Sequence, residues 1–222
     1  MTISFDCYGT LIDWERGILK SLKPVLRKHG IFLDDDEILS IYAEIESDLE
    51  RVYRPYKEIL ELVVEEFGRR FGFEPDPYER NVLVDSIVEW EPFEDVRDTL
   101  LKIKKSHEIA VISNTDDDII ERSIEKIGVD FDHVITAQRV GSYKPSIEVF
   151  KKAMEMMKVS KDEWIHVGQS VYHDIIPARK FGLKTILVLR RGYGATPKVE
   201  GKADFVVEDL SGIVSIIEGI SS

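Results

Sequence analysis

Cysteine is almost absent from this 222-residue chain: its one thiol, Cys7, has no partner for an intramolecular disulfide. This scarcity is typical of a reducing compartment, and we expect a cytoplasmic protein. No stretch approaches the roughly 20 consecutive apolar residues of a membrane-spanning helix. The segment Met1–Gly9 also lacks the basic flank and apolar run of a secretory signal. We therefore expect a soluble protein with no membrane partner.

Positive charge is also in short supply. The chain has 30 lysine and arginine residues against 42 aspartate and glutamate residues, which gives a formal net charge of −12. A phosphate backbone is repelled by such a surface, so we expect no nucleic-acid partner. Only 14 glycines and 8 prolines are present, which excludes a collagen-like chain, and 43% hydrophobic residues exclude a disordered one.

The second half of the chain alternates two kinds of segment. Short apolar runs without polar alternation are typical of strands buried on both faces of a parallel sheet. Segments with apolar residues at helical spacing lie between these runs, and this alternation predicts an α/β fold with a Rossmann-like, doubly wound parallel sheet. The predicted strands are Ile3–Phe5, Ile109–Ser113, His133–Thr136, Trp164–Gly168, Thr185–Leu189 and Asp204–Val207, and the helices are Asp117–Ile127, Ile147–Met157 and Ile175–Phe181.

Between the first two predicted strands lies a long segment with helical periodicity and no strand pattern. Apolar residues recur at helical spacing, as in Ile59–Phe67, and Gly30 and Gly72 separate the helical stretches. We predict a helical cap domain over residues 13–91, inserted into a core of residues 1–12 and 92–222. The apolar face of Ile59–Phe67 is compatible with either a monomer or a homodimer.

Polar side chains follow the predicted strands, where parallel strands bring their carboxyl ends to one crevice. Asp6 is the candidate nucleophile, because a carboxylate can form an ester or acyl phosphate that water then hydrolyses. A nearby Lys144 is expected to lower the pKa of Asp6. Asp174 can orient that lysine, bind a metal or activate water. The remaining polar residues at these ends, able to bind an anion, are Thr10, Ser113, Asn114, Gln169 and Ser170.

Structural roles compete with these functional ones. Asp6, Asp174 and the segment Ser113–Asp116 suit turns and helix N-caps, Lys144 suits a solvated loop, and His173 suits a half-exposed helix. The acidic runs Asp34–Asp36 and Asp116–Asp118 are expected to be solvated helix starts. Tyr42, Tyr53 and Tyr56 are expected to pack within the cap, with one of them possible at the cleft.

Four motifs in order resemble those of the haloacid dehalogenase superfamily, and the resemblance covers the whole chain. They are Phe5-Asp6-Cys7-Tyr8-Gly9-Thr10-Leu11, Val111-Ile112-Ser113-Asn114, Tyr143-Lys144-Pro145, and His166-Val167-Gly168-Gln169-Ser170 with Asp174. The resemblance implies a Rossmann-like core with a helical cap, Asp6 as nucleophile, and Tyr8, Thr10, Lys144 and Asp174 as further catalytic residues. It also implies a substrate bound by Ser113, Asn114, Gln169 and Ser170.

Two chemistries occur in that superfamily. Most members of that superfamily are magnesium-dependent phosphatases, which carry an acid where this chain has Tyr8 and an aspartate where it has Gln169. Tyr8 is instead similar to the 2-haloacid dehalogenase branch, which displaces halide from carbon without a cofactor. A phosphatase would hold Mg²⁺ with Asp6, the Tyr8 carbonyl and Asp174.

The chain also departs from the dehalogenases. They carry a cap arginine near Tyr42, an asparagine near Val171 and a tyrosine near Phe150. Arg51 and Arg54 are the candidates to replace that arginine. The expectation is a hydrolase acting on a small anionic substrate, most like a 2-haloacid dehalogenase. A magnesium-dependent phosphatase and a catalytically idle binding protein are the alternatives.

Overall fold

In the computed structural model, which describes residues 1–190 and 195–221, six parallel strands form one sheet in the order β3-β2-β1-β4-β5-β6. Each predicted strand is confirmed to within one residue at either end. The sheet consists of β1 (Thr2–Phe5), β2 (Glu108–Ser113), β3 (His133–Thr136), β4 (Trp164–Gly168), β5 (Lys184–Val188) and β6 (Phe205–Val207). The chain thus starts in the middle of the sheet, with β1 between β2 and β4.

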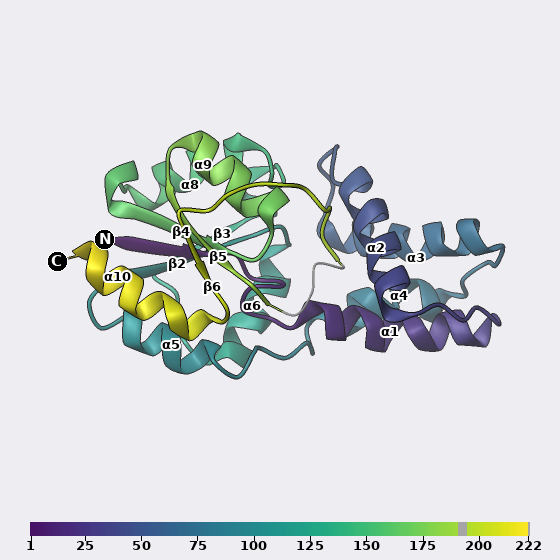
Figure 1. Ribbon diagram of the computed structural model, residues 1–222. Coiled ribbons are helices and arrows are strands. Elements are labelled where there is room, and N and C mark those ends of the chain that lie inside the picture. The colour runs from purple at the N-terminus through teal and green to yellow at the C-terminus, as the bar shows by residue number, and fades with distance from the viewer. Residues whose placement is uncertain (191–194, 222) are drawn as a thin grey trace.

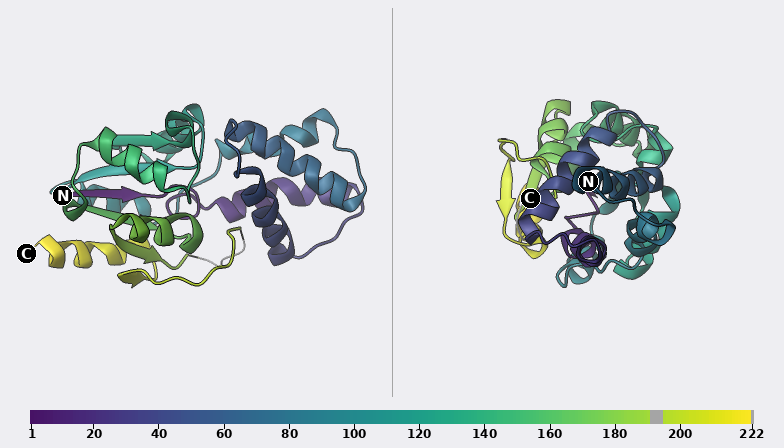
Figure 2. Two further views of the ribbon diagram at one scale, coloured as in Figure 1. Left: turned by 90° about the horizontal axis from the view of Figure 1, so that it is seen from above. Right: turned by 90° about the vertical axis from the view of Figure 1, so that its right-hand side faces the viewer.

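Helices cover both faces of the sheet, which confirms the doubly wound fold (Figures 1 and 2). Alternate residues of β2 point to opposite faces: Ile109 and Val111 pack with one hydrophobic cluster, and Ala110 and Ile112 with the other. The first cluster includes α5 (Val96–Ile103), α6 (Asp117–Ile127) and α10 (Ile213–Ser221), and the second includes α7 (Ala137–Val140), α8 (Ile147–Met157) and α9 (Ile176–Phe181). Helices α5 and α10 were not expected from the sequence. The one-turn π-helix Val171–Ile175 precedes α9.

Four helices follow β1 and lie together at one end of the molecule, beyond the carboxyl end of β1, while both termini lie at the opposite end (Figure 1). They are α1 (Trp14–Lys28), α2 (Asp35–Leu49), α3 (Tyr56–Phe71) and α4 (Pro77–Ile87); we call them the helical cap. The domain boundaries at residues 12/13 and 91/92 stay a prediction. Within the described residues, every helix is too short or too polar to cross a bilayer.

Local sequence explains how these cap helices start and pack. Asp34 and Asp76 accept hydrogen bonds from the backbone N–H groups of Glu37 and Glu79, whose side chains accept from the N-cap backbone in return. In α1, Gly17 lies against the indole of Trp90, where an added Cβ would come within 2.4 Å of the ring. These local contacts start α2 and α4 and hold α1 against Trp90.

Candidate active site

Asp6 directly follows β1, and its carboxylate is held from two sides. Its Oδ1 accepts a hydrogen bond of 2.8 Å from Lys144 Nζ, and its Oδ2 accepts one of 2.6 Å from the Thr10 hydroxyl. Gly9 has a φ of +93°, and an added Cβ would lie 2.9 Å from Trp14 Nε1, so the turn between Asp6 and Thr10 favours glycine. The backbone of Gln169 donates to the Thr10 hydroxyl at 2.9 Å, which fixes that side chain.

Lys144 joins two carboxylates. Its Nζ lies 2.8 Å from Asp6 Oδ1 and 2.7 Å from Asp174 Oδ1, and it also donates to the Ile112 carbonyl at 2.9 Å. The lysine side chain is 1% exposed, so these three acceptors replace water around its ammonium group. A solvated loop lysine is therefore excluded. The structure thus brings together the three ionisable groups that the sequence pointed to.

The two carboxyl groups respond differently to this shared lysine. Burial raises the pKa of Asp6, and the charge of Asp174 adds to that effect, while Lys144 and Thr10 act in the opposite direction. Burial also acts to raise the pKa of Asp174, but Lys144 and His166 outweigh it and hold that pKa below its usual range. The expected lowering by Lys144 is present at Asp6, but burial and Asp174 exceed it, so the net direction there is a correction to our expectation.

A second group of polar side chains, His166 and Ser4, adjoins Asp174, and the sequence analysis did not assign it a role. His166 Nε2 lies 3.1 Å from Asp174 Oδ1, and His166 Nδ1 lies 2.8 Å from the Ser4 hydroxyl. Phe150, where dehalogenases have tyrosine, packs edge-on against the imidazole. At Gly168 an added Cβ would come within 2.7 Å of Asp174 Oδ2, so glycine there lets the carboxylate approach the end of β4. The signal was a histidine within an otherwise apolar strand.

Three of the four predicted substrate-binding residues surround the same point. Ser113, Asn114 and Ser170 line one cavity with Asp6. Asn114 donates to the Lys144 carbonyl at 2.9 Å and accepts from the Lys144 N–H at 2.8 Å, which holds the lysine loop against β2. Gln169 lies outside that lining, in a neighbouring depression beside Gly9 and Trp14. His173, expected to be half-exposed, is buried, and its N–H donates to the Ser170 hydroxyl.

The Tyr8 side chain also borders the cavity, but its hydroxyl is engaged elsewhere. It lies 2.6 Å from the Ser123 hydroxyl on α6. Burial raises the pKa of Tyr8 well above its ordinary value, so the phenol stays neutral. Its hydrogen-bonding partner is therefore outside the group around Asp6, and a catalytic role for Tyr8 stays a prediction that this hydrogen bond does not support.

The cap contributes two buried glutamate side chains, which the sequence analysis did not single out. Glu46 lies in α2, and Glu50 is the residue that follows this helix. Glu46 Oε1 accepts hydrogen bonds from the Tyr42 and Tyr56 hydroxyls at 2.9 and 2.5 Å. Glu50 Oε1 accepts one of 3.1 Å from Asn114 Nδ2, across the boundary between cap and sheet. Burial raises the pKa of each glutamate to about 8. Both therefore carry a proton at neutral pH.

Contacts between the cap and the sheet correct two expectations and agree with a third, that one cap tyrosine lies at the cleft. Asp116 is a buried acceptor rather than a solvated helix start: it receives the backbone N–H groups of Tyr56 and Lys57 at the start of α3. Arg51 pairs with Asp48 and is 77% exposed, and Arg54 pairs with Glu58, so neither replaces a cap arginine at the cavity. Tyr56, not Tyr42, is the cap tyrosine that lines the cavity.

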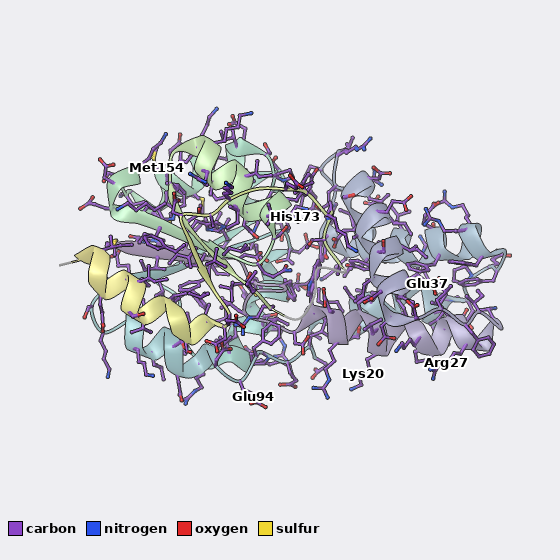
Figure 3. The ribbon with its side chains drawn as sticks, in the orientation of Figure 1. Lys20, Arg27, Glu37, Glu94, Met154 and His173 are labelled. Atoms are coloured by element: carbon purple, nitrogen blue, oxygen red, sulfur yellow. The ribbon has the colours of Figure 1, made fainter. Side chains whose placement is uncertain are left out.

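The cavity between cap and sheet is small, with a volume of about 30 Å³. That is room for about two water molecules. Figure 3 shows His173 at the boundary between the sheet and the helical cap. Besides the residues named above, Trp14, Thr115 and Thr196 complete its wall.

The oxygen atoms around Asp6 are poorly arranged for Mg²⁺. Three of the four carboxylate oxygens of Asp6 and Asp174 already accept hydrogen bonds, and the Lys144 ammonium lies between the two groups. Of these four oxygens, Asp174 Oδ2 is the one buried without a hydrogen-bond partner. Among the described side chains, no set of three or more His, Cys, Asp or Glu is placed to hold a metal ion. As arranged, this donor set does not fit the cation.

The buried cap glutamates predict a pH-dependent stability. Because the folded state holds protons on Glu46 and Glu50 up to about pH 8 and the unfolded chain releases them near 4.5, the folded state binds more protons between these values. Their contribution to the free energy of unfolding is present below pH 4.5 and is lost as the pH rises through 8. As the pH rises from 6.5 to 8, we expect the free energy of unfolding of Glu46→Gln to increase relative to that of the wild type by on the order of 2 kcal/mol.

Denaturant unfolding at several pH values measures this difference. Buried His166 and His173, whose pKa values burial lowers, change stability in the opposite direction below pH 6.5, so the comparison is made above it. The matched control is Glu44→Gln, an exposed glutamate on the same helix. A constant difference between Glu46→Gln and wild type over this window would contradict the prediction.

Known proteins share both sequence and fold with this chain. A family model described as haloacid dehalogenase-like hydrolase matches residues 3–188. The chain is 26% identical over 226 residues to the (S)-2-haloacid dehalogenase of Pseudomonas sp. (strain YL), covering 97% of this chain and 94% of that protein. It is 28% identical over 238 residues to the glyceraldehyde 3-phosphate phosphatase of Pyrococcus furiosus, covering 97% and 92%. Both chemistries expected from the motifs thus occur among its relatives.

Among solved structures, the L-2-haloacid dehalogenase from Xanthobacter autotrophicus superimposes with a TM-score of 0.82 at 18% identity, covering 98% of each chain. A magnesium-bound hydrolase, YfnB from Bacillus subtilis, superimposes with a TM-score of 0.80 at 17% identity, covering 98% of each chain. At these identities the structural similarity establishes the fold and leaves the reaction open.

Proposed function

Because this chain belongs to the haloacid dehalogenase-like hydrolases, we propose that Asp6 is its covalent nucleophile and that it hydrolyses a small anionic substrate as a 2-haloacid dehalogenase does. The observation that carries the proposal is the lysine bridge: one buried ammonium lies within 2.8 Å of both Asp6 and Asp174. It supplies at this point the positive charge that a metal ion supplies in other hydrolases.

In the first step, an Asp6 oxygen attacks the carbon that carries the leaving group. A carbon–oxygen bond forms, the carbon–halogen bond breaks, and the halide leaves with the bonding pair. No atom of the leaving group needs a proton, which agrees with a Tyr8 hydroxyl bound to Ser123. Lys144 and Thr10 hold the carboxylate in one orientation for this attack. The Ser113 hydroxyl is the proposed donor to the substrate's own carboxylate, because the side-chain amide of Asn114 already donates to Lys144 and Glu50.

In the second step, water hydrolyses the Asp6 ester. Asp174 is the proposed base, because its Oδ2 is buried without a hydrogen-bond partner and the residue lines the cavity that holds Asp6. Water attacks the ester carbonyl as Asp174 takes one of its protons, and the ester carbon–oxygen bond breaks. The leaving oxygen takes that proton from Asp174 to give the hydroxy acid, and Asp6 is regenerated as a carboxylate when the second proton of the water passes to solvent. His166 and Lys144 fix Asp174 for this role through its other oxygen.

Halide release from L-2-chloropropionate in the presence of EDTA tests the proposal. We expect turnover that the chelator does not change and that yields one halide for each hydroxy acid formed. Absence of halide release at high enzyme concentration would contradict the dehalogenase reaction.

A magnesium-dependent phosphatase is the second candidate, and the phosphatases among the curated relatives favour it. It would use the same Asp6, with the Tyr8 carbonyl and Asp174 as the proposed metal ligands. Gln169, where phosphatases carry an aspartate in the fourth motif, counts against it. Hydrolysis of small phosphomonoesters that EDTA abolishes would favour this candidate over the dehalogenase.

A further inference from the structure

The helical cap presents an acidic and aromatic wall to the cavity that holds Asp6. Glu46 and Glu50 contribute two carboxyl groups, and the rings of Trp14 and Tyr56 lie beside them. Glu46 is 3% exposed, and the Glu50 side chain is 5% exposed. Carboxyl groups on a solvated helix face stay exposed, so the burial of Glu46 and Glu50 needs another explanation. We seek it in the cavity that these two residues line.

Positive charge is nearly absent from this cavity. Its described lining contains four carboxyl groups, those of Asp6, Asp174, Glu46 and Glu50, against one permanent cation, Lys144. That lysine is already shared by Asp6 and Asp174. The two cap glutamates therefore lack a counter-charge and keep a proton instead.

One of these carboxyl groups has an unused oxygen. Glu50 Oε2 is buried without a hydrogen-bond partner, and so is His173 Nε2, 3.5 Å away from it. That separation is too long for a good hydrogen bond between the two atoms. Since both residues line the same cavity, a single polar group placed there can contact both of them.

We propose that this wall, centred on Glu50 and completed by Glu46, Trp14 and His173, binds a primary ammonium group of the substrate. The proposal deepens the proposed function, on which it rests: the reacting end of the substrate is anionic and its other end is cationic. Carboxylates and aromatic faces both attract an ammonium ion, and burial strengthens the attraction. The cavity that this wall lines is small, so it suits a compact cationic group such as –NH₃⁺.

Binding would replace the proton on a cap glutamate with the ammonium group of the ligand. As the ammonium group enters, the protonated glutamate nearest to it loses its proton to solvent, so that an ammonium–carboxylate pair replaces a neutral acid. We therefore expect binding near neutral pH to release protons, and affinity to increase as the pH rises toward 8. A wall that only donates hydrogen bonds to an anion would show the opposite pH dependence.

Matched ligand pairs test the proposal without requiring turnover. β-Alanine and butyrate share a carboxylate and differ in an ammonium against a methyl group; 2-aminoethylphosphonate and propylphosphonate form the same pair for a phosphate-like end. The four dissociation constants are measured by calorimetry at pH 7 in two buffers of different ionisation enthalpy. We expect at least one ammonium ligand to bind about tenfold or more tightly than its methyl partner, with release of protons.

Glu50→Gln should bring that ratio close to one without weakening the methyl ligand, whereas Glu44→Gln, exposed on the same helix, should leave it unchanged. Equal binding within both pairs, a ratio unaffected by Glu50→Gln, or no binding by either ammonium ligand would each overturn the proposal. Failure of the proposed nucleophile is seen separately, as turnover that persists in Asp6→Asn.

Discussion

Asp6→Asn should reduce kcat by at least about a thousandfold, because an amide cannot displace the leaving group from carbon. The substitution is nearly isosteric. The asparagine oxygen can still accept from Lys144, and its amide can donate to the Thr10 hydroxyl, so the fold should be retained. Steady-state turnover and the thermal midpoint of unfolding measure the two expectations.

The matched control is Asp118→Asn, an exposed aspartate at the start of α6 that pairs with Lys57. This control should keep wild-type turnover. An Asp6→Asn enzyme with turnover within tenfold of the wild type would show that another group is the nucleophile, provided that mass measurement excludes conversion back to aspartate.

Lys144→Met should lower the free energy of unfolding at pH 7 by roughly 3–5 kcal/mol, the range seen when one partner of a buried ion pair is removed. The methionine leaves Asp6 and Asp174 facing each other in a buried site, where Asp174 is completely inaccessible to solvent. Since protonation relieves their repulsion, the loss should shrink as the pH falls from 7 to 5. Denaturant midpoints at the two pH values measure this.

Two further variants make the lysine experiment decisive. Lys151→Met removes a half-exposed lysine that pairs with Glu148 and should cost little stability. Adding Asp6→Asn to Lys144→Met should restore part of the loss, because it removes one of the two opposed charges. The same loss at pH 5 and pH 7, or no gain in the double variant, would contradict the lysine bridge as the main source of stability.

The sheet was predictable because each strand is a short apolar run with no polar alternation. Two helices, α6 and α8, have the bounds that their apolar spacing indicated. Placement of the site followed from the same logic: Asp6 and Lys144 are 138 residues apart in sequence, but both follow strands whose carboxyl ends meet. The strand order and helices α5 and α10 were not predicted.

The cap side of the site could not be predicted from one sequence. Glu46 lies in an acidic stretch of α2, and Glu50 directly follows this helix. The composition of this stretch is that of a solvated helix face. Their burial depends on how the cap closes on Asn114 and His173, which local patterns do not encode. Asp116 was misjudged for the same reason, because its partners are backbone N–H groups 59 and 60 residues away.

The most direct test of the central claim is to trap the intermediate on Asp6. The enzyme is mixed with excess L-2-chloropropionate, quenched in acid during turnover and digested, and the peptide that contains Asp6 is examined by mass spectrometry. We predict a fraction of this peptide carrying the propionate fragment as an ester at Asp6, and none in Asp6→Asn. Halide release with an unmodified Asp6 at every quench time, or with the fragment on a different side chain, would contradict it.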